Sequence, residues 1–313
     1  MAEKIATREA YGNALAEFGD KYDFVVLDAD LAAATKTGVF KKKFPHRFFN
    51  CGIAEGNMAS VAAGLAAAGV NVFASTFAMF AAGRAFEQIR NSIGYPHLSV
   101  KIGATHAGIT VGEDGATHQC LEDIALMRTI PGMTIINPAD AVEARAAVEA
   151  AMTINGPVYM RFGRLAVPVI FDAETYKFEL GKGRVLAEGK DVTIVATGIM
   201  TEMALRASQM LADEGVSARV INIHTIKPID RDIIIAAARE TGAIVTAEEH
   251  NVLGGLGGAV AEVTAESFPV PVLRVGTQDV FGKSGKVPAL LEYYGLTPEN
   301  IVAKAKAAIN LKR

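Results

Sequence analysis

The stretch that decides the fold is EGNMASVAAGLAAAGVNVFAST, residues 55–76. Its first part, residues 56–69, is rich in alanine and glycine and predicts a helix that packs closely on a sheet. Its last part, residues 71–76, is a short apolar run and predicts a buried strand. After Glu55 the stretch contains no charged residue. A helix followed directly by a buried strand is the repeating unit of a parallel sheet.

Helix and strand patterns alternate on both sides of this stretch. Further helices are predicted at residues 6–19, 79–92, 120–127 and 139–152. Further strands are predicted at residues 24–30, 47–52, 98–105, 133–139 and 157–163, and in a second series at residues 192–198, 217–223, 243–250 and 269–276. The alternation predicts an α/β protein with two domains, each with a mainly parallel sheet flanked by helices.

The composition changes between the two series. Residues 163–191 contain proline, glycine and charges without a clean hydrophobic period, as is typical of a connection between domains. A chain of 313 residues is long enough for two domains of ordinary size. We therefore predict a first domain at residues 1–172, a linker at 173–189 and a second domain at 190–313.

Composition also limits the classes of function and the compartment. The net charge is −3 with mixed signs, so no affinity for nucleic acid is expected. The N-terminus is typical of an amphipathic helix rather than a signal peptide, and no apolar run reaches membrane-spanning length without interruption, so no membrane association is expected. The two cysteines, Cys51 and Cys120, lie far apart, which argues against a disulfide framework or a structural zinc site. A cytoplasmic protein is expected.

Glu55 is the residue whose placement most needs a reason. It has no basic neighbour in the local sequence and precedes an apolar helix. A buried carboxyl group without a partner is costly unless something hydrogen-bonds it. From the residues alone two explanations stay open: Glu55 caps free N–H groups at the start of the helix, or it is kept for chemistry.

The densest polar segment is GATHAGITVGEDGATHQ, residues 103–119. It follows a predicted strand, and loops at the carboxyl ends of parallel strands are where ligands bind. His106 and His118 bracket Glu113 and Asp114, with glycines between them. The pattern favours a ligand site over a tight loop whose polar residues only satisfy turns. A metal site is disfavoured, because no pair of candidate ligands has helical spacing.

Two further pairs of residues are candidates whose value depends on the fold. Phe77 and Phe80 are three residues apart at a strand-to-helix junction, where they form either ordinary core aromatics or a platform for a ring. Arg8 and Arg161 could bind an anion if the fold brings them into one cleft, and are otherwise surface residues.

Taken together, GIAEGNMASVAAGLA, ASTFAMF, THAGITVGEDGATHQ, IPGMTIINPAD and the closing FGKSGKVPALLEYYGLTPENIVAKAKAAI resemble the C-terminal half of transketolase. The resemblance spans nearly the whole chain, and deoxyxylulose-phosphate synthase shares its STF and THQ elements. Transketolases hold the diphosphate of thiamine diphosphate and its Mg²⁺ through a GDG…N signature, and no GDG occurs in this sequence. The resemblance therefore implies the β-type subunit of a split transketolase. Its cofactor would be thiamine diphosphate, with Mg²⁺ (or Ca²⁺) held by the partner subunit.

The resemblance also implies roles for individual residues. Glu55 matches the catalytic glutamate that contacts N1′ of the aminopyrimidine ring, and His118 matches a second residue at the reacting end of the donor. The residues implied in cofactor binding are Asp30, Glu55, Phe77 and Phe80. Those implied in substrate binding are Arg8, His106, Asp114, His118 and Arg161. Two positions depart from the family. Gly83 replaces a common tyrosine, so that wall of the pocket is thinner or is filled otherwise. Ala34 replaces a phosphate-binding serine, so that either phosphate affinity is weaker or the neighbouring Thr35 substitutes for the serine.

The function implied is the transfer of a two-carbon ketol unit from a ketose phosphate to an aldose phosphate, as in the pentose phosphate pathway. The implied partners are a diphosphate-binding N-terminal subunit and a second copy of this chain, together forming a heterotetramer. Three alternatives stay open: the β subunit of a 2-oxoacid dehydrogenase E1 component, a deoxyxylulose-phosphate synthase-like half enzyme, and a non-catalytic subunit of the same fold.

Overall fold

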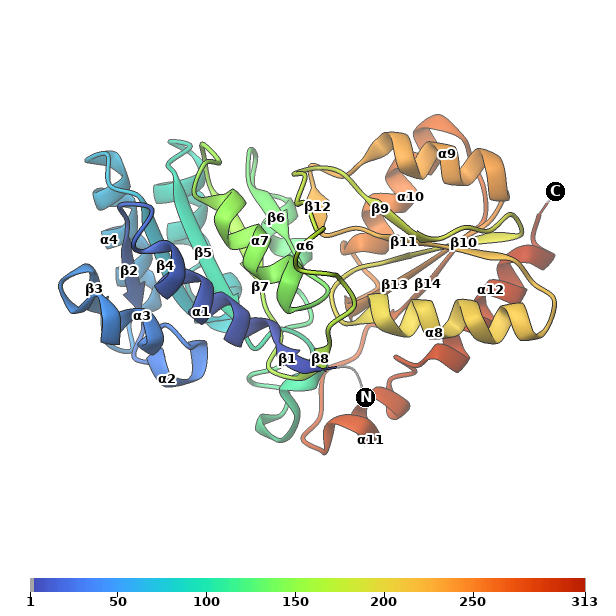
Figure 1. Ribbon diagram of the computed structural model, residues 1–313, viewed down its shortest axis with the longest axis horizontal. Coiled ribbons are helices and arrows are strands. Elements are labelled where there is room, and N and C mark those ends of the chain that lie inside the picture. Colours follow the sequence, from blue (N-terminus) through green and yellow to red (C-terminus); the bar gives the residue numbers. More distant parts are fainter. Residues whose placement is uncertain (1–2, 313) are drawn as a thin grey trace.

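Two sheets follow one another along the chain and lie side by side in the computed structural model, which describes residues 3–312 (Figure 1). The first sheet has seven strands in the order β12-β6-β7-β5-β4-β2-β3, and the second has five in the order β14-β13-β10-β11-β9. All neighbouring strands in both sheets are parallel except β12 and β9, which are antiparallel to their neighbours. The predicted α/β fold with two mainly parallel sheets is confirmed.

The strands of the first sheet are β2 (Val25–Asp28), β3 (Phe48–Asn50), β4 (Val72–Phe77), β5 (Val100–Thr105), β6 (Thr134–Ile136), β7 (Val158–Arg161) and β12 (Thr225–Lys227). Those of the second sheet are β9 (Arg184–Ala187), β10 (Val192–Ala196), β11 (Ala218–Asn222), β13 (Ile244–Asn251) and β14 (Val272–Thr277). A separate pair joins β1 (Lys4–Ala6) to β8 (Ala166–Pro168).

Helices cover both faces of the first sheet because its strands are apolar on both sides. In β2, Val26 packs in the cluster formed by α1 (Thr7–Phe18) and α7 (Ala141–Ala151), whereas the next residue, Leu27, packs with α4 (Glu55–Ala67) on the opposite face. Successive side chains of a strand point to opposite faces, so both belong to the core. The apolar helix of residues 55–67 thus packs on one side of the central strands, together with the segment of residues 78–93 and α6 (Asp123–Arg128).

The remaining helices connect and cover the sheets. In the first half they are α2 (Ala32–Thr35), α3 (Gly38–Lys43), α5 (Phe86–Gln88) and α6 (Asp123–Arg128), with 3₁₀ turns at Pro45–Arg47 and Ile109–Asp114. In the second half they are α8 (Met200–Asp213), α9 (Arg231–Thr241), α10 (Leu256–Ser267), α11 (Val287–Tyr293) and α12 (Pro298–Asn310). Side-chain caps mark several starts: Asp140 accepts from the Glu143 amide and Asp230 from the Ile233 amide.

Two local predictions differ from the structure. The helix predicted at residues 79–92 is not continuous, because π-helical turns at Phe80–Arg84 and Ile89–Gly94 flank the short α5. The stretch read as a connection contributes β8 and β9, and β12 of the second half pairs with β6 of the first sheet. The two halves are therefore linked by sheet hydrogen bonds, and the boundaries at 172 and 190 stay a prediction.

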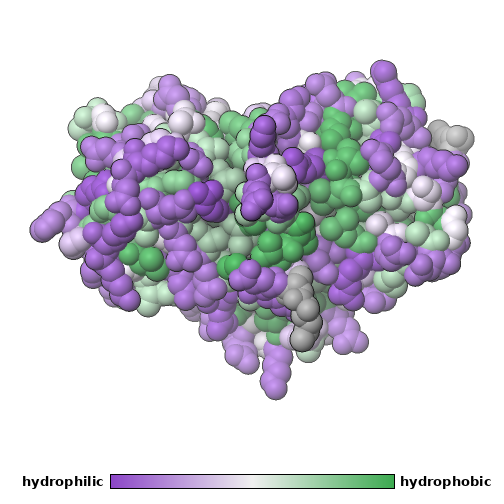
Figure 2. All heavy atoms as spheres, in the orientation of Figure 1, coloured by the Kyte–Doolittle hydropathy of each residue, from purple (hydrophilic) through white to green (hydrophobic). Residues whose placement is uncertain are grey.

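The surface of one face is mostly hydrophilic, with apolar residues gathered near the middle, where the two halves meet (Figure 2). Within residues 3–312, no helix has both the length and the apolar character needed to cross a membrane.

Candidate active site

The predicted site residues gather at the carboxyl ends of the first sheet's parallel strands, where ligands bind in folds of this kind. Phe77 ends β4, His106 follows β5, and Asp30 follows β2. Both Asp30 and His106 have positive φ angles, of 64° and 57°, which ordinary side chains adopt uncommonly. The exposed Asp30 accepts a hydrogen bond from the side-chain amide of Asn50 at 2.7 Å.

Glu55 is the first residue of α4 and is only 1% exposed. Its carboxylate accepts a hydrogen bond from Nη1 of Arg84 at 2.8 Å, and Arg84 is itself about half exposed, at 52% of its side chain. The expectation of a carboxyl group without a basic partner is therefore wrong. The partner lies 29 residues further along the chain, so the local sequence could not reveal it.

Arg84 contacts Phe80 as well as Glu55. Its guanidinium lies 4.6 Å from the centre of the Phe80 ring, at the end of the π-helical turn Phe80–Arg84. Such turns are rare and occur frequently at functional sites. The planar cation thus lies over Phe80 and bonds Glu55, two residues that the resemblance assigns to the cofactor. The Glu55 carboxylate accepts from Arg84, and no side-chain cap is formed at the start of α4, which does not support the capping explanation.

Four rings form one cluster next to this pair. Phe77 and Phe80 stack with centroids 5.7 Å apart and planes 19° apart. His106 stacks on Phe77 at 3.8 Å, and His118 meets Phe80 edge-on at 5.4 Å. Phe77 is buried whereas Phe80 is partly exposed, so the cluster is open to a ligand on the Phe80 side.

His106 connects the aromatic cluster to Arg8. Its Nε2 lies 3.1 Å from Nη1 of Arg8, and its Nδ1 lies 3.0 Å from Oγ1 of Thr105. Burial, and next the charge of Arg8, lowers the pKa of His106 to about 3. The imidazole is therefore neutral at pH 7, with Nε2 accepting from Arg8 because a guanidinium can only donate. His106 positions Arg8 and adds no positive charge.

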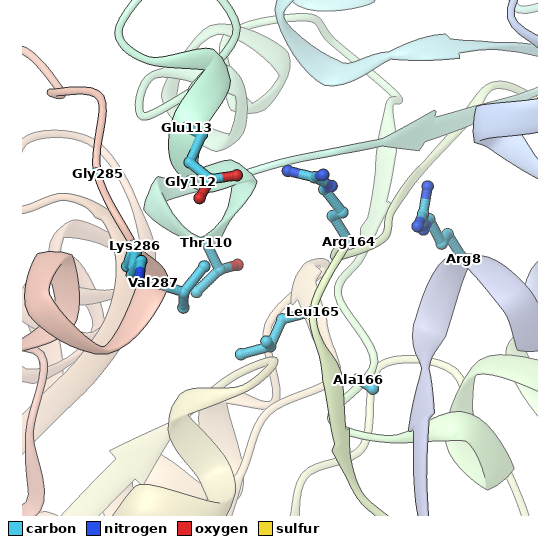
Figure 3. Close-up of a pocket in the computed structure, with 10 residues that line it drawn as sticks. All are labelled: Arg8, Thr110, Gly112, Glu113, Arg164, Leu165, Ala166, Gly285, Lys286 and Val287. Carbon is cyan, nitrogen blue, oxygen red and sulfur yellow. The ribbon is translucent and has the colours of Figure 1, made fainter.

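A cleft of about 390 Å³ lies beyond Arg8, between the two halves of the chain (Figure 3). Arg8 and Arg164 line it on one side, and residues 285–287 of the second half line it on the other. Burial lowers the pKa of Arg8, the Glu9 carboxylate opposes this, and the nearby charge of Arg164 lowers the pKa further. Among the described residues, the buried Nε of Arg8 has no hydrogen-bond partner. Two repelling guanidinium groups with a free donor suit an anion that accepts from both.

The position of Thr35 excludes one expectation about the anion site. Thr35 is fully buried and donates to the Asp28 carboxylate at 2.7 Å, so it does not face the cleft in place of the missing serine. The backbone carbonyl of Ala34 instead accepts from Arg8 at 2.9 Å.

Arg161 needs correcting as a candidate substrate ligand. It is 3% exposed, and its Nε donates to Asp123 at 2.9 Å while its Nη2 donates to the carbonyl of Glu249 at 2.8 Å. These contacts commit Arg161 to a buried ion pair with Asp123 of the first half and to a backbone carbonyl of the second half. The sequence analysis missed Arg164, three residues later in YMRFGR, which lines the cleft. The strand ends at Arg161, and only the residues after it reach the ligand edge.

Asp114 is exposed at the end of the 3₁₀ turn Ile109–Asp114, with its carboxylate 3.9 Å from Nη1 of Arg164. It therefore stands at the rim of the cleft, and His118 stands between this loop and Phe80. Among residues 3–312, no three His, Cys, Asp or Glu side chains are grouped closely enough to hold a metal ion.

Comparison with known families gives the chain its place. Residues 3–169 match the transketolase pyrimidine-binding domain, and residues 181–301 match the transketolase C-terminal domain. The chain belongs to the transketolase family. The resemblance to the C-terminal half of transketolase is confirmed.

Individual transketolase relatives cover the chain almost completely. A putative transketolase C-terminal section from Methanocaldococcus jannaschii is 51% identical over 95% of this chain and 94% of its own length. A 6-deoxy-6-sulfo-D-fructose transketolase subunit from a Clostridium species is 45% identical over 95% of this chain and 92% of its own. A solved split-gene transketolase is described as an inactive tetramer of four beta subunits. It has a TM-score of 0.92 and 57% identity, covering 99% of this chain and 100% of that one. The chain is thus a transketolase-type β subunit in sequence and fold.

Proposed function

We propose that this chain, with a separate diphosphate-binding subunit, transfers a two-carbon ketol unit from a ketose phosphate to an aldose phosphate. The observation that carries the proposal is the continuity of two sites. The aromatic pocket around Glu55 and the cationic cleft share His106, whose ring contacts Phe77 at 3.8 Å and Arg8 at 3.1 Å. A ring bound on Phe80 and an anion bound by Arg8 would therefore belong to one reacting assembly.

The residues present fit the aminopyrimidine end of thiamine diphosphate. Arg84 already places a planar N–H donor on Phe80 and against the Glu55 carboxylate, and such a group would make the same two contacts. Bound there, the cofactor would supply the electron sink for breaking and forming the carbon–carbon bond. Glu55 would share a proton with the ring nitrogen, in a site that excludes water. Arg84 has to leave Glu55 before the Glu55 carboxylate can bond the ring nitrogen.

The rest of the cofactor is assigned to the partner subunit. The diphosphate carries most of the cofactor's charge, and a GDG…N motif for its metal is not in this sequence. Mg²⁺ (or Ca²⁺) and the diphosphate would therefore be bound by the partner. Apolar side chains near the pocket, with Ile53 78% and Phe49 48% exposed, suit burial against a second copy or the partner in a four-chain assembly. A cytoplasmic location fits this role.

The cleft supports an anionic sugar over an oxoacid. Arg8, Arg164 and Lys286 line it together with one carboxylate, Glu113, so cationic groups predominate. Asp114 lies 3.9 Å from Arg164 at the rim, with a carboxylate that can accept from a sugar hydroxyl. The Clostridium relative is named for a sugar that ends in a sulfonate, which is also a terminal anion. We assign Arg8 and Arg164 to the terminal phosphate, Asp114 to an acceptor hydroxyl, and His106 and His118 to the reacting end.

The experiment is a substrate test on the assembled enzyme with thiamine diphosphate and Mg²⁺. Xylulose 5-phosphate with ribose 5-phosphate should give ketol transfer. Turnover of pyruvate with a dye acceptor would instead indicate a 2-oxoacid dehydrogenase, and carbon dioxide release from pyruvate with glyceraldehyde 3-phosphate would indicate a deoxyxylulose-phosphate synthase. No cofactor binding by the assembly at all would indicate a non-catalytic subunit.

A further inference from the structure

Residues 110–113 of the turn Ile109–Asp114 each have a backbone group bonded to a side chain from elsewhere in the chain. Glu249 accepts from the Thr110 amide at 2.6 Å, and Arg164 donates to the Val111 carbonyl. Gln119 donates to the Gly112 carbonyl at 3.1 Å, and Ser284 donates to the Glu113 carbonyl at 2.6 Å. Two of these four side chains, Glu249 and Ser284, come from the second half of the chain.

Glu249 makes the innermost of these contacts. It lies on β13, is 3% exposed, and fits against Gly108, where an added Cβ would come within 2.2 Å of its carboxyl carbon. Gly108 also has a φ of +83°, so the close approach and the backbone shape both require glycine there. Burial raises the pKa of Glu249, opposed by Arg161 and by the Thr110 amide. A buried carboxyl group, which is costly to bury, thus holds one amide of the turn that carries Asp114.

The second half also forms one wall of the cleft. Gly285, Lys286 and Val287 lie across it from Arg164, and the Gln119 side chain bonds the carbonyl of Lys283 at 2.9 Å. The turn is therefore held between the two halves. Any shift of the second half would move Asp114 relative to Arg8, which belongs to the first.

We propose that Glu249 is a positioning residue for substrate recognition, through which the C-terminal domain fixes the turn that presents Asp114 to the acceptor sugar. The proposal rests on the function proposed above for the site. A misplacement of about 1 Å in a group that orients a substrate can lower the rate on the order of a hundredfold. Loss of the Glu249 contact should therefore damage use of the acceptor and leave cofactor binding intact.

The neighbouring Glu248 provides a matched control. It lies on the same strand, is fully buried, and its carboxylate accepts from the Leu256 and Gly257 amides at 2.6 and 2.8 Å. Both partners are at the start of α10, in the C-terminal domain itself. Glu248→Leu removes a carboxylate of the same kind and burial without touching the turn.

The experiment compares Glu249→Leu, Glu249→Gln and Glu248→Leu in the assembled enzyme. In Glu249→Leu the KM for the acceptor sugar should rise tenfold or more, with the Kd for thiamine diphosphate within about twofold of wild type. Glu249→Gln keeps an acceptor oxygen for the Thr110 amide and should restore the KM to within about threefold. Equal KM values in Glu249→Leu and Glu248→Leu would overturn the proposal.

Hydrogen exchange of the isolated chain gives a readout that needs no activity. The amides of residues 109–114 should exchange faster in Glu249→Leu, and those at the start of α10 in Glu248→Leu. Unchanged exchange of the turn in Glu249→Leu would contradict the positioning role. If that variant does not fold, Ser284→Ala removes an exposed contact to the same turn and should raise the acceptor KM about threefold; an unchanged KM and unchanged exchange would count against the proposal. A wild-type assembly without ketol transfer would refute the proposed function alone, since exchange still tests the contact.

Discussion

Replacing Arg84 by methionine should strengthen cofactor binding and at the same time lower the stability of the chain. In the wild-type chain the cofactor ring has to displace a guanidinium that bonds Glu55 at 2.8 Å and lies 4.6 Å over Phe80. Methionine keeps an unbranched side chain for packing on Phe80 but cannot donate to the carboxylate. The perturbation therefore removes the competition for Glu55 and retains an apolar contact on Phe80.

The magnitude follows from the exposure of the two groups. A hydrogen bond to a charged group contributes about 1.5–3 kcal/mol, and the 52% exposure of the Arg84 side chain places this one near the lower end. Since about 1.4 kcal/mol corresponds to a tenfold change in affinity, Arg84→Met should lower the Kd of the assembled enzyme for thiamine diphosphate about tenfold. The isolated chain should at the same time lose about 1–3 kcal/mol of its free energy of unfolding, because Glu55 is left buried without a partner.

The assay is calorimetric titration of the assembled enzyme with thiamine diphosphate, together with denaturant unfolding of the isolated chain. Arg90→Met is the control, because Arg90 is an exposed arginine bonded to its neighbour Asn91. Arg90→Met should change neither the Kd for thiamine diphosphate nor the free energy of unfolding. Weaker cofactor binding by Arg84→Met would refute the reasoning, since it would mean that Arg84 contributes a contact to the bound cofactor rather than competing with it.

Three further predictions follow from the cleft and from a buried histidine. Arg164→Met should raise the KM for phosphorylated sugars at least tenfold while leaving that for their unphosphorylated counterparts within twofold, and an equal effect on both would contradict a phosphate contact. Asp114→Ala should reduce discrimination between acceptors that differ at C2 by about 1–3 kcal/mol in kcat/KM, and an equal loss for both configurations would count against its bond to a sugar hydroxyl. His224 has a pKa lowered by burial from 6.5 to about 4, so the unfolded chain binds a proton between these values that the folded chain does not, and stability falls as the pH drops through this window. The free energy of unfolding of His224→Gln, relative to that of wild type, should therefore rise by about 2 kcal/mol on going from about pH 7.5 to about pH 5, as measured by denaturant unfolding. A difference independent of pH would contradict the assignment.

The elements of the fold could be predicted from periodicity because its strands and helices are locally consistent. The charge-free residues 56–76 show a helix and a strand directly, and both occur as α4 and β4. The antiparallel strand β12 could not be predicted in the same way. It has three residues, and it pairs with β6 of the first sheet across about ninety residues of chain. It is therefore a strand because of this tertiary contact and not because of its local sequence.

The site residues that could be predicted are those that lie at or just after the end of a predicted strand. Phe77 ends a strand, Phe80 and His106 follow strands, and the fold brings their rings together. The partners of these residues come from distant segments: Arg84 reaches Glu55, and Glu249 reaches Thr110 from the second half. Arg161 and Arg164 show the limit most plainly, since both are arginines in one hexapeptide. Only the point at which β7 ends decides which of them is buried and which faces the cleft.

The most direct test of the account is a titration of this chain into a fixed amount of the diphosphate-binding subunit, with thiamine diphosphate and Mg²⁺ present, measuring ketol transfer from xylulose 5-phosphate to ribose 5-phosphate. Each subunit alone should be inactive, activity should saturate near equal molar amounts, and Glu55→Ala should assemble in the same ratio but retain no more than a few per cent of the rate. Full activity of this chain with the partner rigorously excluded, or wild-type rates from assembled Glu55→Ala, would contradict the account.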